Sequence, residues 1–115
     1  MLELAAKAAG LTYHRGVIRI SINGAYRWKP WNPRDDDGDA LRLLVTLRLD
    51  AHFEDQPNWI GELIEVYGRE DDTGARHCEA HALSPDPYAA ARLAILRAAA
   101  EVGRNMPEGK KTHTT

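Results

Sequence analysis

The amino-acid sequence predicts an α+β fold with seven elements in the order α-β-β-α-β-β-α. Three observations support this prediction. Apolar residues recur at helical spacing in three segments, they alternate with polar residues in two pairs of extended segments, and turn-forming residues separate these segments. We therefore expect a four-stranded, mainly antiparallel sheet with helices packed on it, an α/β/α sandwich.

Length and composition bound the domain organisation. With 115 residues, 43% hydrophobic and 28% charged, the chain suits one globular domain with a modest core. We expect residues 1–104 to form this domain and residues 105–115 to form a flexible tail. No apolar run is long enough to span a bilayer and no N-terminal signal pattern appears, so we expect no membrane partner. The single cysteine, Cys78, excludes an internal disulfide and suits a reducing cytoplasm.

The first third of the chain predicts a short helix and then a hairpin. Residues 2–9 (LELAAKAA) form the helix, and Gly10 ends it in the left-handed conformation. Residues 12–30 form the hairpin, in which isoleucines alternate along the first strand and Asn23-Gly24 makes the turn.

The pairing register of this hairpin has two solutions. A two-residue turn pairs Ile20 with Arg27. A three-residue turn instead places Tyr26 and Trp28 on the isoleucine face, because one added residue reverses the faces of the return strand. The sequence allows either register.

Residues 28–49 form the most informative stretch of the chain. Asp36 or Asp37 caps a helix that we expect over residues 37–49, and Asp39 faces the positive end of the helix dipole. The apolar positions of this helix cover a wider arc than one amphipathic stripe: Ala40, Leu41, Leu43, Leu44, Val45 and Leu47. We therefore expect protein to cover the helix on two sides, with a sheet on one side and another helix or chain on the other.

The second half of the chain predicts a loop and a second hairpin. Residues 50–59 form a polar loop that Phe53 and Trp59 anchor, and strands follow over residues 60–68 and 75–82. Alternation along the last strand places three small residues on one face, where we expect them to fill the core: Cys78, Ala80 and Ala82.

The C-terminal helix has clear boundary signals. Asp86 caps it, and Pro87 follows in the first turn, where a missing N–H costs nothing. Its many alanines allow close approach to a sheet or another helix. We expect the helix to stop at Gly103.

Three stretches of the chain are LELAAKAAGL at the start, WNPRDDDGDALRLLVTLRL in the middle and DPYAAARLAILRAAAEVGR near the end. Together they resemble the phage ABA sandwich domain family, a family of small phage and prophage proteins. The resemblance covers nearly all of the chain up to Arg104, and the middle block is its most specific part. It implies a sheet with helices on both faces and residence in the cytoplasm of the host cell. The family has no established activity, so the resemblance implies no functional residues.

No pattern predicts a catalytic residue, a cofactor or a metal site, so we expect a non-enzymatic protein. Asp35, Asp37 and Asp39 alternate as at the start of a calcium loop, but the glycine and the closing glutamate of such a loop are out of place. His77, Glu79 and His81 share one strand face. His77 and His81 are four residues apart, which is about 13 Å along a strand that rises about 3.3 Å per residue, so one zinc ion cannot bridge them unless the strand bends.

Basic and aromatic residues in the 13–34 segment make a candidate binding surface. Residues 1–34 carry six Lys/Arg against one acid, although the net charge is −2. Such mixtures hold nucleotides or single-stranded nucleic acid, and the candidate residues are Arg19, Arg27, Trp28, Lys29, Trp31 and Arg34. The simpler interpretation places the aromatics in the core and the basic residues in solvent, and the pI of about 6.2 favours it.

The first functional hypothesis is a phage or prophage accessory protein that binds a host or phage protein partner and is itself a homodimer. The apolar, alanine-rich helices favour the dimer. The alternatives are a nucleotide- or nucleic-acid-binding module that uses the 13–34 hairpin, and a small virion or assembly component.

Overall fold

The computed structural model describes residues 1–56, 61–70 and 72–107 and confirms an α+β fold. Within these ranges the helices are α1 (Leu2–Ala8), α2 (Asp37–Thr46) and α3 (Pro87–Arg104). The strands are β1 (Tyr13–His14), β2 (Val17–Ile22), β3 (Ala25–Pro30), β4 (Asp50–Gln56), β5 (Gly61–Tyr67) and β6 (Cys78–Ala82). They form two antiparallel sheets, ordered β1-β2-β3 and β4-β5-β6. The prediction of one four-stranded sheet is therefore wrong, and β1 and β4 are additional to the predicted order.

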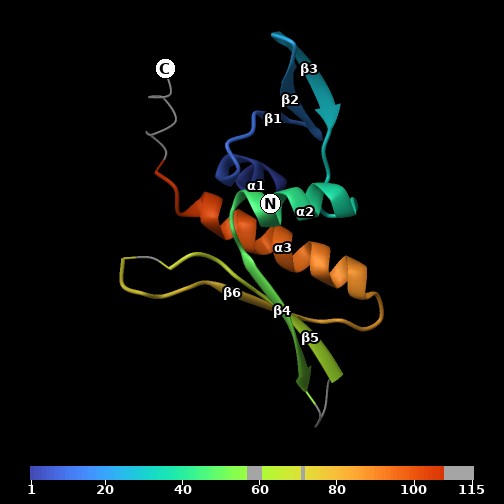
Figure 1. Cartoon of the computed structure of the whole chain (residues 1–115), viewed down its shortest axis with the longest axis vertical. Helices are drawn as coiled ribbons and strands as arrows, with labels where there is room; N and C mark the ends of the chain where they lie inside the picture. The colour runs from blue at the N-terminus through green and yellow to red at the C-terminus, as the bar shows by residue number, and fades with distance from the viewer. Residues whose placement is uncertain (57–60, 71, 108–115) are drawn as a thin grey trace.

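Helix α3 lies between the two sheets (Figure 1). Helices α1 and α2 pack on one side of α3, and strands β5 and β6 pack on the other. The β2–β3 hairpin projects beyond α1 and α2, away from α3. Because the chain crosses from one side of α3 to the other between α2 and β4, strands before and after this crossing cannot join one sheet. The layers are therefore sheet, helix pair, helix and sheet, instead of an α/β/α sandwich.

The contact between α1 and α3 depends on small side chains. Most of the buried residues of α3 are alanines, and Gly103 is buried near its C-terminal end. A Cβ built on Gly103 would lie 1.9 Å from the carbonyl oxygen of Leu4, so the backbones of the two helices are in direct contact there. Lys7 also donates a hydrogen bond to the carbonyl oxygen of Met106, just past α3. Helix α3 ends at Arg104, one residue past the predicted stop at Gly103, and Gly103 itself serves close packing against α1.

The β2–β3 hairpin has the two-residue register. Asn23 and Gly24 both have positive φ, at 52° and 83°, which matches the right-handed twist of the paired strands. Ile20 pairs with Arg27. Tyr26 and Trp28 therefore lie on the face of the hairpin that points away from the isoleucines.

Helix α2 begins as predicted and ends earlier. The Asp36 side chain accepts a hydrogen bond from the backbone N–H of Asp39 and caps the helix. The helix ends at Thr46, three residues before the predicted end, because Arg48 takes a left-handed conformation with φ 55°. The chain can then turn and enter β4.

The apolar arc of α2 is only partly covered. Leu43 is 2% exposed and lies beside Ile18 and Trp31 at the base of the first sheet. Leu41 and Val45, one helical turn apart, are 57% and 60% exposed. The expected two-sided cover therefore holds for Leu43 and fails for Leu41 and Val45 in the single chain.

The second sheet corrects two further predictions. Residues 50–56 form β4 instead of a loop, and Phe53 is exposed instead of acting as an anchor. The small residues of β6 are Cys78, Ala80 and Ala82, and they lie on the outer, exposed face instead of in the core. Trp59 and the 108–115 part of the predicted tail lie outside the described residues.

The close contact at Gly103 predicts that one added methyl group destabilises the fold. We expect Gly103→Ala to lower the free energy of unfolding by about 2 kcal/mol or more, because α1 must move away from α3. This loss should exceed the roughly 1 kcal/mol by which alanine favours a helix over glycine. Urea denaturation followed by circular dichroism measures the change.

Gly68→Ala is the matched control for this substitution. The atom nearest to a Cβ built on Gly68 is the carbonyl oxygen of His77, at 4.0 Å, so the added methyl group has room. Equal stabilities of Gly103→Ala and the unmodified chain would contradict the close helix contact.

Candidate functional site

The β2–β3 hairpin carries an exposed cluster that we call the hairpin face: Arg19, Tyr26 and Trp28. Arg19 pairs with Trp28 across the two strands, and Tyr26 lies diagonally from Arg19 on the same face. The Arg19 guanidinium carbon lies 4.4 Å from the centroid of the Tyr26 ring, a cation–π contact. Tyr26 and Trp28 are 68% and 54% exposed, so the interpretation of these two rings as core residues is wrong.

The other predicted binding residues do not join the hairpin face. Arg27 and Lys29 pair with isoleucines and lie on the opposite side of the hairpin. Trp31 is buried and packs edge-to-face on Tyr13, with 5.7 Å between the ring centroids. Arg34 is exposed ahead of α2, and its carbonyl oxygen accepts a hydrogen bond from α3. The structure therefore brings Arg19 and Trp28 together and separates the rest of the predicted set.

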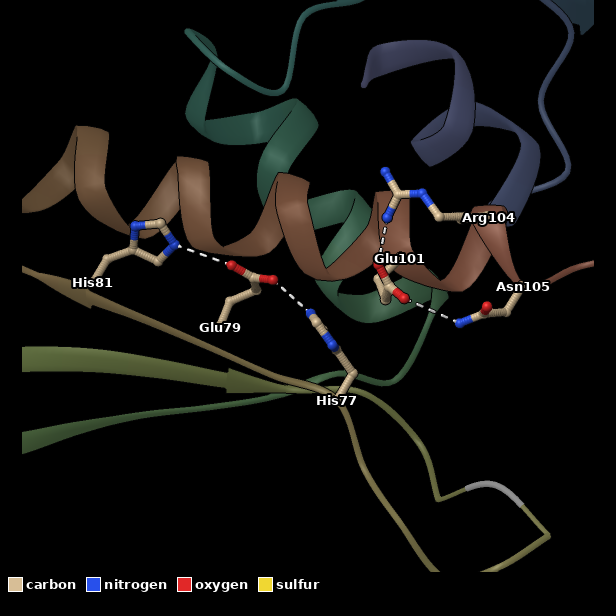
Figure 2. Close-up of polar contacts among 6 residues, drawn as sticks. All are labelled: His77, Glu79, His81, Glu101, Arg104 and Asn105. Atoms are coloured by element: carbon tan, nitrogen blue, oxygen red, sulfur yellow. Dashed lines mark hydrogen bonds and ion pairs between the residues drawn. The ribbon is translucent and has the colours of Figure 1, made fainter.

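A second polar cluster lies between β6 and α3 (Figure 2). Glu79 points toward α3 and lies between His77 and His81, with one carboxylate oxygen directed at each imidazole. The distance from His81 Nε2 to Glu79 Oε1 is 3.4 Å. Both histidines therefore share one carboxylate, which pairs with the Nε2 atom of each ring and lies between the two imidazoles.

His77 also lines a hollow of about 360 Å³ at the end of α3. Glu101 and Asn105 form part of the same wall, and Glu101 accepts hydrogen bonds from Asn105 and Arg104 (Figure 2). The polar groups here are already paired with one another. This arrangement resembles a satisfied surface ion-pair network more than a catalytic cleft.

The outer face of the second sheet holds a third cluster: His52, Glu54 and Glu65. Glu65 lies directly across from His52, and Glu54 lies two residues along β4 on the same face. His52 Nε2 lies 2.8 Å from Glu65 Oε1 and 3.3 Å from Glu54 Oε2. Among the described residues, this is the group whose possible metal-ligand atoms all lie within 4.8 Å of one another.

Tyr67 supports this third cluster. Its ring stacks on the His52 imidazole with 5.6 Å between centroids and 10° between planes, and its hydroxyl lies 3.3 Å from Glu65 Oε1. A hydrogen bond to Cys78, followed by the negative charge of the Cys78 thiolate and then of Glu65, raises the pKa of Tyr67 to about 12.

The sequence contains a signal for this cluster that the loop prediction obscured. His52 and Glu54 share a face only if residues 50–56 form a strand. Pairing of that strand with β5 then places Glu65 beside both residues. The alternation of His52 and Glu54 is consistent with a strand, but the polar composition of the segment favoured a loop.

Comparisons with known proteins do not identify the chain. A scan against models of protein families, a search of curated proteins and a search of solved structures each produced no match. Within the described ranges, no helix combines the length and the apolar character that crossing a membrane requires.

The pKa of Tyr67 yields a spectroscopic prediction. A raised tyrosine pKa favours the neutral form in the folded state, so this stabilisation is present below about pH 10 and is lost as pH rises toward 12. In an absorbance titration of tyrosinate, we expect one late component that Tyr67→Phe removes. Cys78→Ala should shift that component toward pH 10. An unchanged titration curve in Cys78→Ala would contradict the assigned cause.

Proposed function

We propose that this protein is a non-enzymatic binding protein that contacts an acidic protein partner through the hairpin face. The observation that supports the proposal is the exposure of Tyr26 and Trp28 on a hairpin that projects from the body of the molecule (Figure 1). Large aromatic side chains bury about 150–250 Å² each when a partner covers them. Tyrosine, tryptophan and arginine are also the residue types that dominate binding energy at protein interfaces.

Pre-organisation of the face adds to this argument. The contact of Arg19 with Tyr26 and the strand pairing of Arg19 with Trp28 hold the three side chains on one side of a paired ribbon. Side chains that are already ordered lose less conformational freedom when a partner binds. The hairpin face therefore has the composition of a contact surface, and its side chains are held together on one side of the hairpin.

The charge of the hairpin favours an acidic partner. No acid occurs between Glu3 and Asp35, whereas the hairpin segment carries Arg15, Arg27 and Lys29 in addition to Arg19. None of these four residues forms an ion pair with a residue that the structure describes. Arg19 lies on the hairpin face and Arg27 and Lys29 lie on the opposite side, so this charge steers acidic partners toward the hairpin as a whole and does not select one face.

Nucleotide or single-stranded nucleic-acid binding is the second candidate. Basic and aromatic side chains alternate along β3, which is the pattern of a stacking platform. Arg27 and Lys29 lie on the side opposite Tyr26 and Trp28, however, so one surface does not combine the rings with all the positive charge. The net charge of −2 also weighs against a phosphate-binding protein.

We propose a phage or prophage origin and residence in the host cytoplasm from the resemblance of three sequence segments. The two separate sheets differ from the single sheet that the resemblance implies. The resemblance therefore supports the origin of the chain more than its architecture. A small virion or assembly component remains an alternative role, and peptides of this chain in purified particles would favour it.

A homodimer forms part of the proposal, and Leu41 and Val45 support it. Both side chains are more than half exposed on one side of α2. Val45 also lines a shallow hollow together with Leu44 and Leu49. Covering two aliphatic side chains in each copy contributes roughly 1.5–3 kcal/mol per side chain. A second copy of the chain supplies an identical apolar surface, as a two-fold interface requires.

The hairpin proposal predicts selective loss of a partner. We expect Tyr26→Ala/Trp28→Ala to lose a protein that the unmodified chain retains from phage-infected or lysogenic host cells, with at least about tenfold weaker binding to the purified partner. Phe53→Ala is the matched control, because Phe53 is an equally exposed aromatic residue on the other sheet. Equal partner binding by all three chains would reject the hairpin face. Tight binding of a short single-stranded oligonucleotide, lost in the double variant, would favour the second candidate.

The dimer proposal predicts the molar mass of the protein in solution. Light scattering at micromolar concentration should give twice the 12.8 kDa chain mass, and Leu41→Glu should restore the monomer because it buries a charge in the interface. Arg97→Glu, a charge change at an exposed residue of α3, is the control. A monomeric unmodified chain would contradict the proposal.

A further inference from the structure

We propose that His52, Glu54 and Glu65 form a binding site for a divalent transition-metal ion, zinc by preference, on the outer face of the β4-β5-β6 sheet. The proposal is independent of the hairpin face, which belongs to the other sheet at the opposite end of the molecule (Figure 1).

The register of β4 and β5 produces the required geometry. A directly paired residue and a residue two positions along the strand are the nearest neighbours that a side chain has on one face of a sheet. Glu65 and Glu54 occupy these two positions relative to His52. The three side chains therefore converge above the sheet, with all three possible ligand atoms within 4.8 Å of one another.

The cluster around Glu79 shows why this spacing matters. His77, Glu79 and His81 also supply two imidazoles and a carboxylate, but they lie along one line toward α3 (Figure 2). The central carboxylate separates the two imidazoles, so their nitrogens do not reach one ion. A triangle across two strands can close around an ion, and a row along one strand cannot.

The ligand atoms indicate the class of ion. Calcium and magnesium prefer sites made of oxygen atoms, whereas an imidazole nitrogen together with carboxylates suits zinc and its neighbours in the first transition series. Three protein ligands leave at least one position for water or for a group of another molecule. His52 and Glu54 are both exposed, so an ion can enter directly from solvent.

Two further contacts prepare the ligands. The Tyr67 ring stacks on the His52 imidazole, and the Tyr67 hydroxyl lies within reach of Glu65. Contacts of this kind fix the orientation of metal ligands before the ion binds. In the metal-free protein, His52 bonds to the two carboxylates. A bound ion exchanges these contacts for bonds to the same three ligand atoms.

Calorimetric titration of the full chain, free of any histidine tag, with zinc chloride tests the proposal. We expect one ion per chain. His52→Ala and Glu54→Gln should each weaken binding at least about tenfold, since even the loss of an outer partner of a metal ligand costs about 10–100-fold. Glu54→Gln changes a half-exposed side chain, and its circular dichroism spectrum should match that of the unmodified chain. Zinc should raise the melting temperature of the unmodified chain and not that of Glu54→Gln.

His77→Ala and His81→Ala are the matched controls, and both should bind zinc as the unmodified chain does. Cys78→Ser tests the exposed thiol and should also leave binding intact. Absence of zinc binding, unchanged binding in His52→Ala and Glu54→Gln, or loss in a control variant comparable to that in His52→Ala would each overturn the proposal.

Discussion

The direct backbone contact between α1 and α3 is the constraint on which the arrangement of the molecule depends. Gly103 leaves no space for a side chain against the Leu4 carbonyl group, and alanines fill most of the remaining buried positions of α3. Helices that approach this closely gain many weak contacts for each residue. Because α3 also covers Ile64 and Val66 of β5, it joins the second sheet to the helices α1 and α2.

This central helix separates the surfaces on which function can be built. The hairpin face lies on one sheet and the His52 cluster on the other, with three helices between them. One ion pair and one hydrogen bond link α3 to the start of α2: Arg92 of α3 pairs with the Asp37 carboxylate, at 2.7 Å, and donates to the Arg34 carbonyl oxygen. The hairpin face and the His52 cluster therefore both lie on paired strands, and the packed helices between them form the core.

Local signals in the sequence predicted the elements more successfully than their assembly. Asp36 and Asp86 cap their helices, Gly10 takes the left-handed conformation after α1, and Asn23-Gly24 forms the hairpin turn. Each of these features depends on residues within one or two turns of chain. The division into two sheets depends on the path of the chain past α3, which no local pattern encodes.

For the candidate sites, too, the sequence predicted the residues better than their arrangement in space. The mixture of basic and aromatic residues in the 13–34 segment identified Arg19 and Trp28, but their exposure depends on the register, which the sequence left open. The His52 cluster required a strand over residues 50–56 and its pairing with residues 61–67, and the polar composition of the first segment favoured a loop. The small residues of β6 were assigned to the core because small and apolar side chains usually lie there, whereas α3 covers the other face.

Nuclear Overhauser effects from the α-protons of Gly103 test the central position of α3 most directly. The account predicts strong cross-peaks from these protons to the α-proton of Leu4, together with cross-peaks from the Leu96 methyl groups of α3 to neighbouring residues of the core. Spectra of a folded chain in which the Gly103 α-protons contact only residues of α3 and solvent would contradict it.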